Sequence, residues 1–340
     1  MKIGLLTFGS LIPNTDTSVV PSPHQRIGDV IEQGVEAEKM GFDWFAVGEH
    51  HFAGFAISSP PVVLASLASL TSTIRLGTGV TLAANRDPVL MAEDYATLDL
   101  LSGGRVSVVC GKGFYPEPFK VFDQPIETQR ERLAENVSLL LRLWNEESVH
   151  WAGKFRTSLD GITVQPRPLQ ERAPVWMSGG SSEDSSALAA SLGLPIVMNT
   201  AFLPPSEYAP VFARYREIWR SIHADTNPAP TGAVSHVFVA RTSQEAKGRW
   251  REHYRNFFNW GNQQRKSALG IFDFDASISG PAICGSPEEV IEKIGAMQDE
   301  WHHDLHLLSV DIGGMAVAEV LSVMELLAQE VLPATETMSG

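Results

Sequence analysis

Short apolar runs alternate with longer amphipathic segments along the whole chain, and this rhythm constrains the fold more than any other feature. It is typical of a parallel β-sheet whose strands are joined by crossover helices. Eight runs predict buried strands: Ile3–Phe8, Trp44–Val47, Arg75–Val80, Val106–Gly111, Pro174–Ser178, Pro195–Met198, Val234–Ala240 and Leu305–Val310. Helices are expected at Gln25–Met40, Pro61–Ser69, Pro88–Leu101, Glu127–Asn145, Ser182–Leu192, Ser206–Ile222, Ser243–Asn259, Glu288–Gln298 and Val317–Val331. Eight such pairs predict a single α/β domain over residues 1–340, a (β/α)8 TIM barrel, with a doubly wound sheet as the alternative.

Two longer connections interrupt this rhythm. The first, residues 149–172, is rich in proline towards its end and is expected to be an insertion in the barrel. The second, residues 257–285, carries glycine, serine, phenylalanine and aspartate without a clean period. Long connections without regular structure are uncommon in compact domains and are often lids. We therefore expect a mobile lid over the functional site in this second region.

The balance of charge narrows the class of partner. The chain has 26 lysine and arginine residues against 40 aspartate and glutamate residues, a net charge of -14 at pH 7. This surplus opposes binding to nucleic acids and anionic membranes, so we expect a small-molecule partner, no nucleic acid and no membrane. Only two cysteines occur, Cys110 and Cys284, which fits a reducing compartment. With no apolar run as long as a membrane span, the sequence predicts a cytoplasmic protein.

A glycine and serine turn follows the fifth expected strand. Gly179, Gly180, Ser181 and Ser182 lie between this strand and a helix, where successive N–H groups and the positive helix end can bind an anion. An ordinary strand-to-helix turn with a serine cap has the same pattern. Lys112 ends the fourth strand and Arg130 lies early in the following helix, and a phosphate requires such cations. Together these residues predict a phosphate-bearing cofactor.

The third strand ends in GTGVT, residues 77–81, which is rich in glycine but carries no nucleotide-binding fingerprint. The G-x-G-x-x-G motif after the first strand is absent, and so is the P-loop motif. The sequence therefore argues against a Rossmann dehydrogenase. Small residues at a strand end indicate either close approach to a flat ligand or close packing of backbone.

The stretch GEHHF places Glu49, His50 and His51 at the end of the second strand. Burying three titratable groups is costly unless they have a task. Neighbours on a strand point to opposite faces, and the chain has no HExxH motif and no cysteine pair, so we predict no metal. Proton transfer and a structural turn remain as interpretations. A second stretch, WHHDLH at Trp301–His306, precedes the last strand and would lie at the opposite, N-terminal end of a barrel.

Four segments in order resemble the bacterial luciferase-like flavin-dependent monooxygenases. They are GFDWFAVGEHHF, IRLGTGVTLAANRDPVLMAEDYATLDLLSGGR, WMSGGSSEDSSALAASLGLPIV and CGSPEEVIEKI, and the resemblance extends from Met1 to about Pro333. It implies a TIM barrel, usually a homodimer, that binds FMN at the C-terminal rim. Relatives typically receive reduced FMN from a separate flavin reductase and use O2 to oxidise an aldehyde, ketone or other organic substrate. Some relatives use the deazaflavin F420 and transfer hydride.

The resemblance also assigns roles to individual residues. It implies that His50 is the catalytic imidazole, with Glu49 and His51 as its support. It further implies a non-prolyl cis peptide between Gly79 and Val80, behind the flavin ring. The FMN phosphate would meet Lys112 with its neighbour Gly113, and Arg130, or Arg132 if the register shifts. The phosphate turn comprises Gly179, Gly180, Ser181, Ser182 and Ser185. Cys110, by contrast, is expected to be a buried structural thiol.

The leading hypothesis is therefore an FMN-dependent monooxygenase with an apolar substrate pocket. Phenylalanines near the rim and lid favour such a pocket: Phe8, Phe52, Phe55, Phe114, Phe272 and Phe274. Two alternatives remain. One is an F420-dependent hydride-transfer enzyme, and the other is a non-catalytic flavin-binding homologue, against which the retained EHH motif argues.

Overall fold

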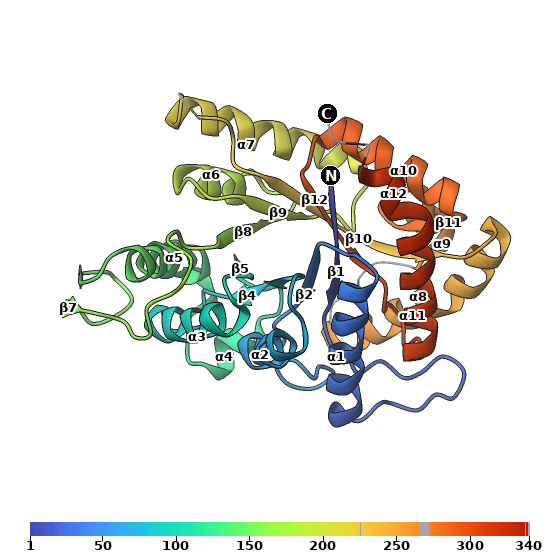
Figure 1. The fold of residues 1–340 in the computed structure, drawn as a ribbon, viewed down its shortest axis with the longest axis horizontal. Coiled ribbons are helices and arrows are strands. Elements are labelled where there is room, and N and C mark those ends of the chain that lie inside the picture. The colour runs from blue at the N-terminus through green and yellow to red at the C-terminus, as the bar shows by residue number, and fades with distance from the viewer. Residues whose placement is uncertain (225, 266–271, 337, 339–340) are drawn as a thin grey trace.

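The structure is a computed structural model that describes residues 1–224, 226–265, 272–336 and 338. Eight parallel strands, each hydrogen-bonded to the next, form its centre: β1 Lys2–Thr7, β2 Trp44–Val47, β3 Arg75–Thr78, β5 Val106–Gly111, β8 Val175–Gly179, β9 Ile196–Asn199, β10 Thr231–Val239 and β12 Leu305–Ser309. Strand β12 pairs with β1, so the sheet closes on itself. Figure 1 shows helices around these strands. The expected (β/α)8 barrel is confirmed, and all eight expected strands are present.

Helices follow the strands on the outside of the barrel. They are α1 Pro23–Lys39, α2 Pro60–Leu70, α3 Pro88–Ser102, α5 Gln129–Asn145, α6 Glu183–Ser191, α7 Ala209–Ile222, α8 Ser243–Arg265, α10 Pro287–Trp301 and α11 Val317–Leu326. A π-helical turn, Leu327–Val331, joins α11 to α12, Leu332–Glu336. Shorter helices are α4 Glu117–Val121, α9 Phe274–Ser279 and the 3-10 turns Ile126–Thr128 and Pro205–Glu207. At α10, Ser286 and Glu289 form the reciprocal capping box that their spacing indicates.

Two apolar cores follow from the alternation of side chains along each strand. The outward-facing residues pack against the helices in one large cluster. The inward-facing residues fill the barrel with a smaller cluster: Leu6, Trp44, Ala46, Val109, Val197, Val234, Leu305 and Leu307. Because the period of a strand is two, each position of a strand is assigned to one of the two cores. The same alternation decides which rim residues face the barrel mouth.

Four short strands interrupt the simple alternation. The third expected strand ends at Thr78, and β4, Thr81–Leu82, resumes beside β5 after a break. The expected insertion at residues 149–172 contains an antiparallel hairpin of β6, Val149–Trp151, and β7, Leu159–Ile162. Strand β11, Ile283–Gly285, adds to the edge of β10. None of these four short strands was predicted as a separate strand.

Both ends of the expected lid, residues 257–285, form regular secondary structure. Helix α8 continues to Arg265, and α9 with β11 occupies most of the far end. Phe257, Trp260 and Phe274 are buried in the outer core. The prediction of a connection without regular structure is therefore wrong for these parts, because the aromatic residues pack as core. Residues 266–271, also within the expected lid, lie outside the described residues.

No helix in the described part of the chain is both long enough and apolar enough to cross a membrane.

Candidate active site

His50 lies at the mouth of the barrel, just beyond the end of β2. Its ring stacks on Phe55 at a centroid distance of 4.2 Å and meets the edges of Phe8 and Tyr115 at 5.3 and 5.5 Å. Phe8 in turn packs against the inner cluster of the barrel. The backbone N–H of His50 donates to the carbonyl of Ile57 at 2.9 Å. The imidazole is thus held among aromatic rings on the inner side of the rim.

Glu49 points the other way and is fully buried. Its Oε1 lies 2.9 Å from Nε2 of His51 and 3.5 Å from a guanidinium nitrogen of Arg86. The carboxylate of Glu49 therefore orients His51. From the sequence alone, either neighbouring histidine could have been its partner. The two histidines therefore have different environments, although both line a cavity of about 150 Å³.

Glu49 also fixes the break between β3 and β4. Its backbone N–H donates to the carbonyl of Val80 at 2.9 Å, and its Oε2 accepts from the N–H of Leu82 at 3.0 Å. The Gly79–Val80 peptide bond is cis, as the resemblance implied. A Cβ on Gly79 would lie 2.5 Å from Leu6, and one on Gly111 would lie 2.9 Å from Val80. A side chain at either glycine would therefore have to displace Leu6 or Val80, because backbone forms part of the inner wall of the rim at these places.

The glycine and serine turn stands at the end of β8. Gly180 has open space around it, since an added Cβ would meet nothing within 4 Å. Ser181 and Ser182 are exposed, and Ser182 caps α6 by accepting from the N–H of Asp184. Within the described residues, the backbone N–H groups of Ser181 and Ser182 meet no acceptor. This arrangement is suited to an anion at a helix N-terminus.

One cation lies beside this turn, and a second lies within electrostatic range of the first. Arg130 forms an exposed ion pair with Asp184 in the first turn of α6. Lys112 lies close enough to Arg130 that the arginine, together with burial as the larger cause, lowers the pKa of the lysine. In the described part of the chain, Lys112 has no carboxylate partner. A dianionic group at this turn would therefore find the free N–H groups of Ser181 and Ser182 beside Arg130, with Lys112 within electrostatic range of that arginine.

The alternative arginine is engaged elsewhere. Arg132 donates from Nε to Thr128 at 3.2 Å, and its guanidinium lies 4.6 Å from the ring of Phe155. Arg130, not Arg132, is therefore the arginine beside the α6 turn.

Three further residues were expected to bind the phosphate, and their contacts in the structure are of a different kind. Gly179 lies within β8, where a Cβ would meet Met198 at 2.5 Å, so close packing between strands explains this glycine. Gly113 has a φ of +78° and packs against Leu82. Ser185 is half-buried in the first turn of α6.

Cys110 is completely buried and faces the outer core. Burial, assisted by the charge of Glu49, raises the pKa of its thiol to about 12. The expected burial of this thiol is confirmed. Of the expected pocket aromatics, Phe8 and Phe55 surround His50, whereas Phe52 and Phe114 are exposed and Phe274 is core.

Some residues of the site were not found from the sequence. Tyr115 touches His50 and Asp184 pairs with Arg130, but neither carries a motif of its own. His236 on β10 is buried, with its Nδ1 3.1 Å from the hydroxyl of Tyr254. His236 follows the inward-facing Val234 by two positions. This spacing could have indicated from the sequence that its side chain also faces the inside of the barrel. Among the described residues, no three His, Cys, Asp or Glu side chains group as metal ligands.

Comparison with known proteins places this geometry in context. A family model described as luciferase-like monooxygenase matches residues 1–301. The alkanal monooxygenase alpha chain of Photobacterium leiognathi is 27% identical over 277 residues, which cover 80% of this chain and 74% of that one. The oxygenase component of flavin-dependent trigonelline monooxygenase of Acinetobacter baylyi is 23% identical over 330 residues, covering 91% and 90%.

Solved structures agree with the fold. The monooxygenase RslO1 of Streptomyces bottropensis superposes with a TM-score of 0.88 at 26% identity, over 98% of this chain and 100% of that one. An F420-dependent secondary alcohol dehydrogenase superposes with a TM-score of 0.77 at 19% identity, over 98% of both chains, a likeness of fold alone. The fold is thus shared by enzymes that use different flavin-type cofactors.

Proposed function

The chain belongs to the luciferase-like monooxygenase family, and from this premise we propose that it is an FMN-dependent monooxygenase. In this proposal, O2 and reduced FMN are used together to oxidise a small apolar substrate of the aldehyde or ketone class. The observation that carries it is the ion pair that holds Arg130 at the N-terminus of α6, with Lys112 within electrostatic range of Arg130 and without an ion pair among the described residues. The aromatic surroundings of His50 at the same rim support it.

The residues present suit the phosphate of FMN. The ammonium of Lys112, the guanidinium of Arg130 and the free N–H groups of Ser181 and Ser182 would hold it. Bound in the reduced state, FMN would supply the electrons that activate O2. The same phosphate site would also accept the phosphate of F420, so the test must compare the two cofactors.

His50 would hold or deliver a proton at an imidazole nitrogen facing the barrel mouth. Phe8, Phe55 and Tyr115 would restrict the access of water to this nitrogen. Glu49 acts through other groups, because its carboxylate orients His51 and its contacts fix the backbone of Val80 and Leu82. Glu49 and His51 are therefore positioning residues in this proposal.

The proposal is tested by oxygen uptake with the purified protein, NADH, FMN and an unrelated flavin reductase. A panel of aldehydes and ketones is expected to contain substrates that gain one oxygen atom from isotope-labelled O2. Binding titrations should show FMN bound more tightly than F420. Hydride transfer from reduced F420 without oxygen uptake would replace the proposal with the alternative. Flavin binding without any turnover would indicate a non-catalytic homologue.

We further propose a separate flavin reductase as the donor of reduced FMN and a homodimer as the assembly. The first is supported by the relative in Acinetobacter baylyi, which is an oxygenase component. The second is supported by five exposed apolar side chains on two neighbouring helices: Val62 and Leu70 on α2, and Leu90, Leu100 and Leu101 on α3. Apolar residues gathered in this way commonly mark a protein interface.

A further inference from the structure

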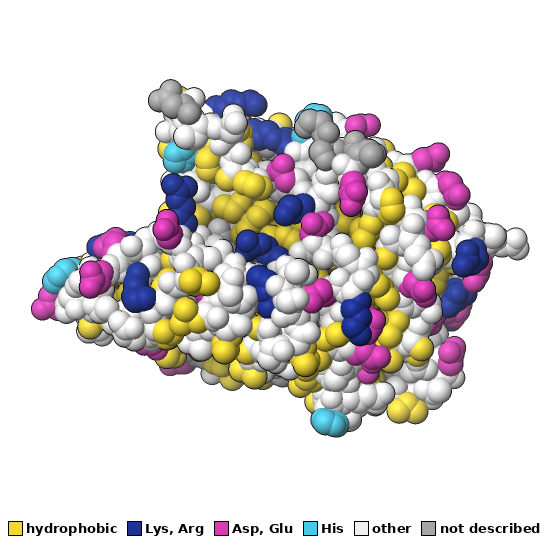
Figure 2. Space-filling view, viewed as in Figure 1, with side chains coloured by type: hydrophobic (Ala, Val, Ile, Leu, Met, Phe, Trp, Pro, Cys, Tyr) yellow, Lys and Arg dark blue, Asp and Glu magenta, His cyan; other side chains and the backbone are white. Residues whose placement is uncertain are grey.

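A cavity of about 800 Å³ opens at the N-terminal ends of the barrel strands, on the face opposite to the proposed flavin site. Figure 2 shows a hollow beside the N-terminus, over β8 and β9, with hydrophobic side chains inside it and lysine or arginine side chains at its edge. This volume is within the range of small-molecule sites. None of the residues assigned above to the flavin or to its phosphate lines it.

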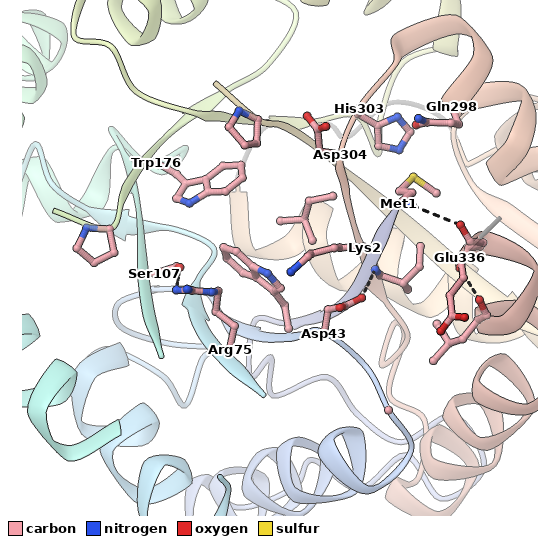
Figure 3. A pocket seen from close by; sticks show the side chains of 18 of the residues that line it. Met1, Lys2, Asp43, Arg75, Ser107, Trp176, Gln298, His303, Asp304 and Glu336 are labelled. Atoms are coloured by element: carbon pink, nitrogen blue, oxygen red, sulfur yellow. Dashed lines mark hydrogen bonds between the residues drawn. The ribbon is translucent and has the colours of Figure 1, made fainter. Parts of the chain in front are cut away.

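Two tryptophans form an aromatic wall of the cavity. The rings of Trp44 and Trp176 meet edge to face with centroids 5.5 Å apart. The ring of Trp44 packs directly against Gly77. A Cβ at that glycine would lie 3.0 Å from the ring. Trp176 is only half-buried and lies at one end of the cavity in Figure 3. The wall is therefore preformed and suits a flat aromatic ligand.

An arginine stands beside this aromatic wall. The guanidinium carbon of Arg75 lies 5.8 Å from the ring of Trp44, and its Nη1 donates to Val106 O and to Ser107 Oγ, both at 3.0 Å. Nη2 and Nε make no hydrogen bond among the described residues. Burial lowers the pKa of Arg75, because the protein only partly replaces the water that solvates its charge. A bound anion would stabilise the charge of Arg75 and so replace the stabilisation that is lost when burial removes water from the guanidinium.

Two further cations line the cavity, Lys2 and Arg172. Within the described part of the chain, neither of them nor Arg75 forms an ion pair. Two carboxylates of the wall are already engaged: Asp43 accepts from the N–H of Ile3 at 2.9 Å, and Asp304 from that of Thr231 at 2.8 Å. Glu336 lies away from Trp176 and Arg75 in Figure 3. The aromatic end of the cavity thus holds cations that are not paired with a carboxylate within 4.0 Å among the described residues, although the charge of Asp99 acts on Arg75.

The other end carries buried polar atoms without partners. Nδ1 of His303 and Oε1 of Gln298 are buried and make no hydrogen bond among the described residues. His303 has no exposed surface, and Figure 3 shows both side chains across the cavity from Trp176. Leaving a buried polar atom unpaired costs about 1–3 kcal/mol. A ligand that displaces the side chains covering these two atoms would therefore gain by completing them.

The imidazole can adapt to such a ligand. Nε2 of His303 lies 3.1 Å from Nδ1 of His306, whose Nε2 lies 2.9 Å from Oγ of Ser235. Both histidines are buried, which lowers their pKa values and keeps the rings neutral. If the protons along this chain shift together, Nδ1 of His303 can either donate or accept. Oε1 of Gln298 can only accept, so the ligand must offer a donor.

We propose that this cavity binds an aromatic carboxylate that carries a hydroxyl or amino group at the end remote from its carboxylate. The carboxylate binds Arg75 with Arg172 or Lys2, the ring packs against Trp44 and Trp176, and the remote group hydrogen-bonds His303 and Gln298. The inference is independent of the proposed function, because it uses the opposite face of the barrel.

Calorimetric titration of the full-length protein with three probes tests the ligand class. The probes are 6-hydroxy-2-naphthoate, 2-naphthoate, which lacks the hydroxyl, and 2-naphthol, which lacks the carboxylate. We expect 6-hydroxy-2-naphthoate to bind about fivefold more tightly than 2-naphthoate and at least about tenfold more tightly than 2-naphthol. Absence of binding at millimolar probe, or equal binding of the hydroxynaphthoate and 2-naphthol, overturns the proposal.

Two substitutions locate the bound probe. Arg75→Gln and Arg172→Gln should each weaken the binding of 6-hydroxy-2-naphthoate, Arg75→Gln by about tenfold or more. Arg172 is exposed and donates no hydrogen bond to the backbone of the described residues, so its variant remains informative if Arg75→Gln does not fold. Lys112→Ala at the opposite rim and Arg142→Gln on α5 should leave the affinity unchanged. Binding that is insensitive to both cavity variants, or that Lys112→Ala abolishes, shows that the probe binds elsewhere and rejects the site.

Discussion

At the scale of single residues, the ammonium of Lys112 is the clearest indication of an anionic ligand at the C-terminal rim. It is half-buried, its pKa is lowered by burial and by Arg130, and no carboxylate of the described chain compensates it. Placing a cation at this cost without a partner is unfavourable unless a ligand supplies the opposite charge. The phosphate of FMN would do so.

Lys112→Ala should therefore weaken FMN binding by at least about tenfold, the typical value of one charge-assisted hydrogen bond. Riboflavin, which lacks the phosphate, should bind the variant within about twofold of the wild type. Flavin fluorescence titrations measure both affinities. Lys120→Ala removes an exposed lysine of α4 and is the matched control. Equal weakening of FMN and riboflavin by Lys112→Ala would remove Lys112 from the phosphate site.

His50 should affect the reaction more than the binding of flavin. His50→Ala is expected to leave FMN affinity within about threefold of the wild type, because the ring contacts aromatic side chains away from the phosphate turn. The fraction of flavin oxidation coupled to product should fall by about tenfold or more. His24→Ala, at the exposed start of α1, provides the control. Unchanged coupling in His50→Ala excludes the proposed role.

At the scale of elements, one carboxylate joins helix α1 to the loop before β3. Glu38 accepts from the N–H groups of Ser72, Thr73 and Ile74 at 2.7 to 2.9 Å. Partial burial alone would raise its pKa, but these three donors outweigh burial and lower the pKa to about 2. The loop leads directly into the strand whose far end carries Gly79 and Val80. Glu38 thus contributes to the position of the rim.

The contribution of Glu38 should depend on pH. Its folded-state pKa of about 2 lies below the ordinary value of 4.5, so the stabilisation is complete above 4.5 and disappears as the pH falls towards 2. Glu38→Gln should lower the free energy of unfolding by about 1 kcal/mol at pH 7 and by much less at pH 3.

Urea unfolding at both pH values measures this difference. Glu32→Gln, an exposed carboxylate on the same helix, should have a small effect at both pH values. A loss for Glu38→Gln that is the same at pH 7 and pH 3 would contradict the assigned role of the charge.

At the scale of the whole molecule, the exposed leucines and valine of α2 and α3 predict how copies of the chain assemble. Sedimentation velocity should find the wild type as a dimer. The double variant Val62→Glu with Leu101→Glu should sediment as a monomer, because charges would be buried in an apolar interface. Ile222→Glu, at the exposed end of α7, is the control and should remain dimeric. A wild type that is monomeric at micromolar concentration would refute the prediction.

The barrel itself could be predicted because its signals are local. Eight apolar runs, helix starts such as Ser286-Pro287 and the period of two along each strand are readable without knowing any contact. The same is true of the rim motifs, since the carboxyl ends of parallel strands in a barrel must meet. The extent of the second connection was mispredicted because Phe257, Trp260 and Phe274 pack into the core by long-range contacts, which no local pattern indicates.

The local periodicity of the sequence determined the alternating strands and helices, and the family resemblance selected a barrel over a doubly wound sheet. Together they determined the end of the barrel at which Glu49, His50, Lys112 and the serine turn lie. Only the tertiary structure decided which of them interact. It turned Glu49 towards His51, placed Arg130 and not Arg132 beside α6, and opened a cavity at the other end between Trp176 and His303. The physical reason is that a contact between distant segments depends on side-chain direction and packing in three dimensions, which spacing along the chain does not encode.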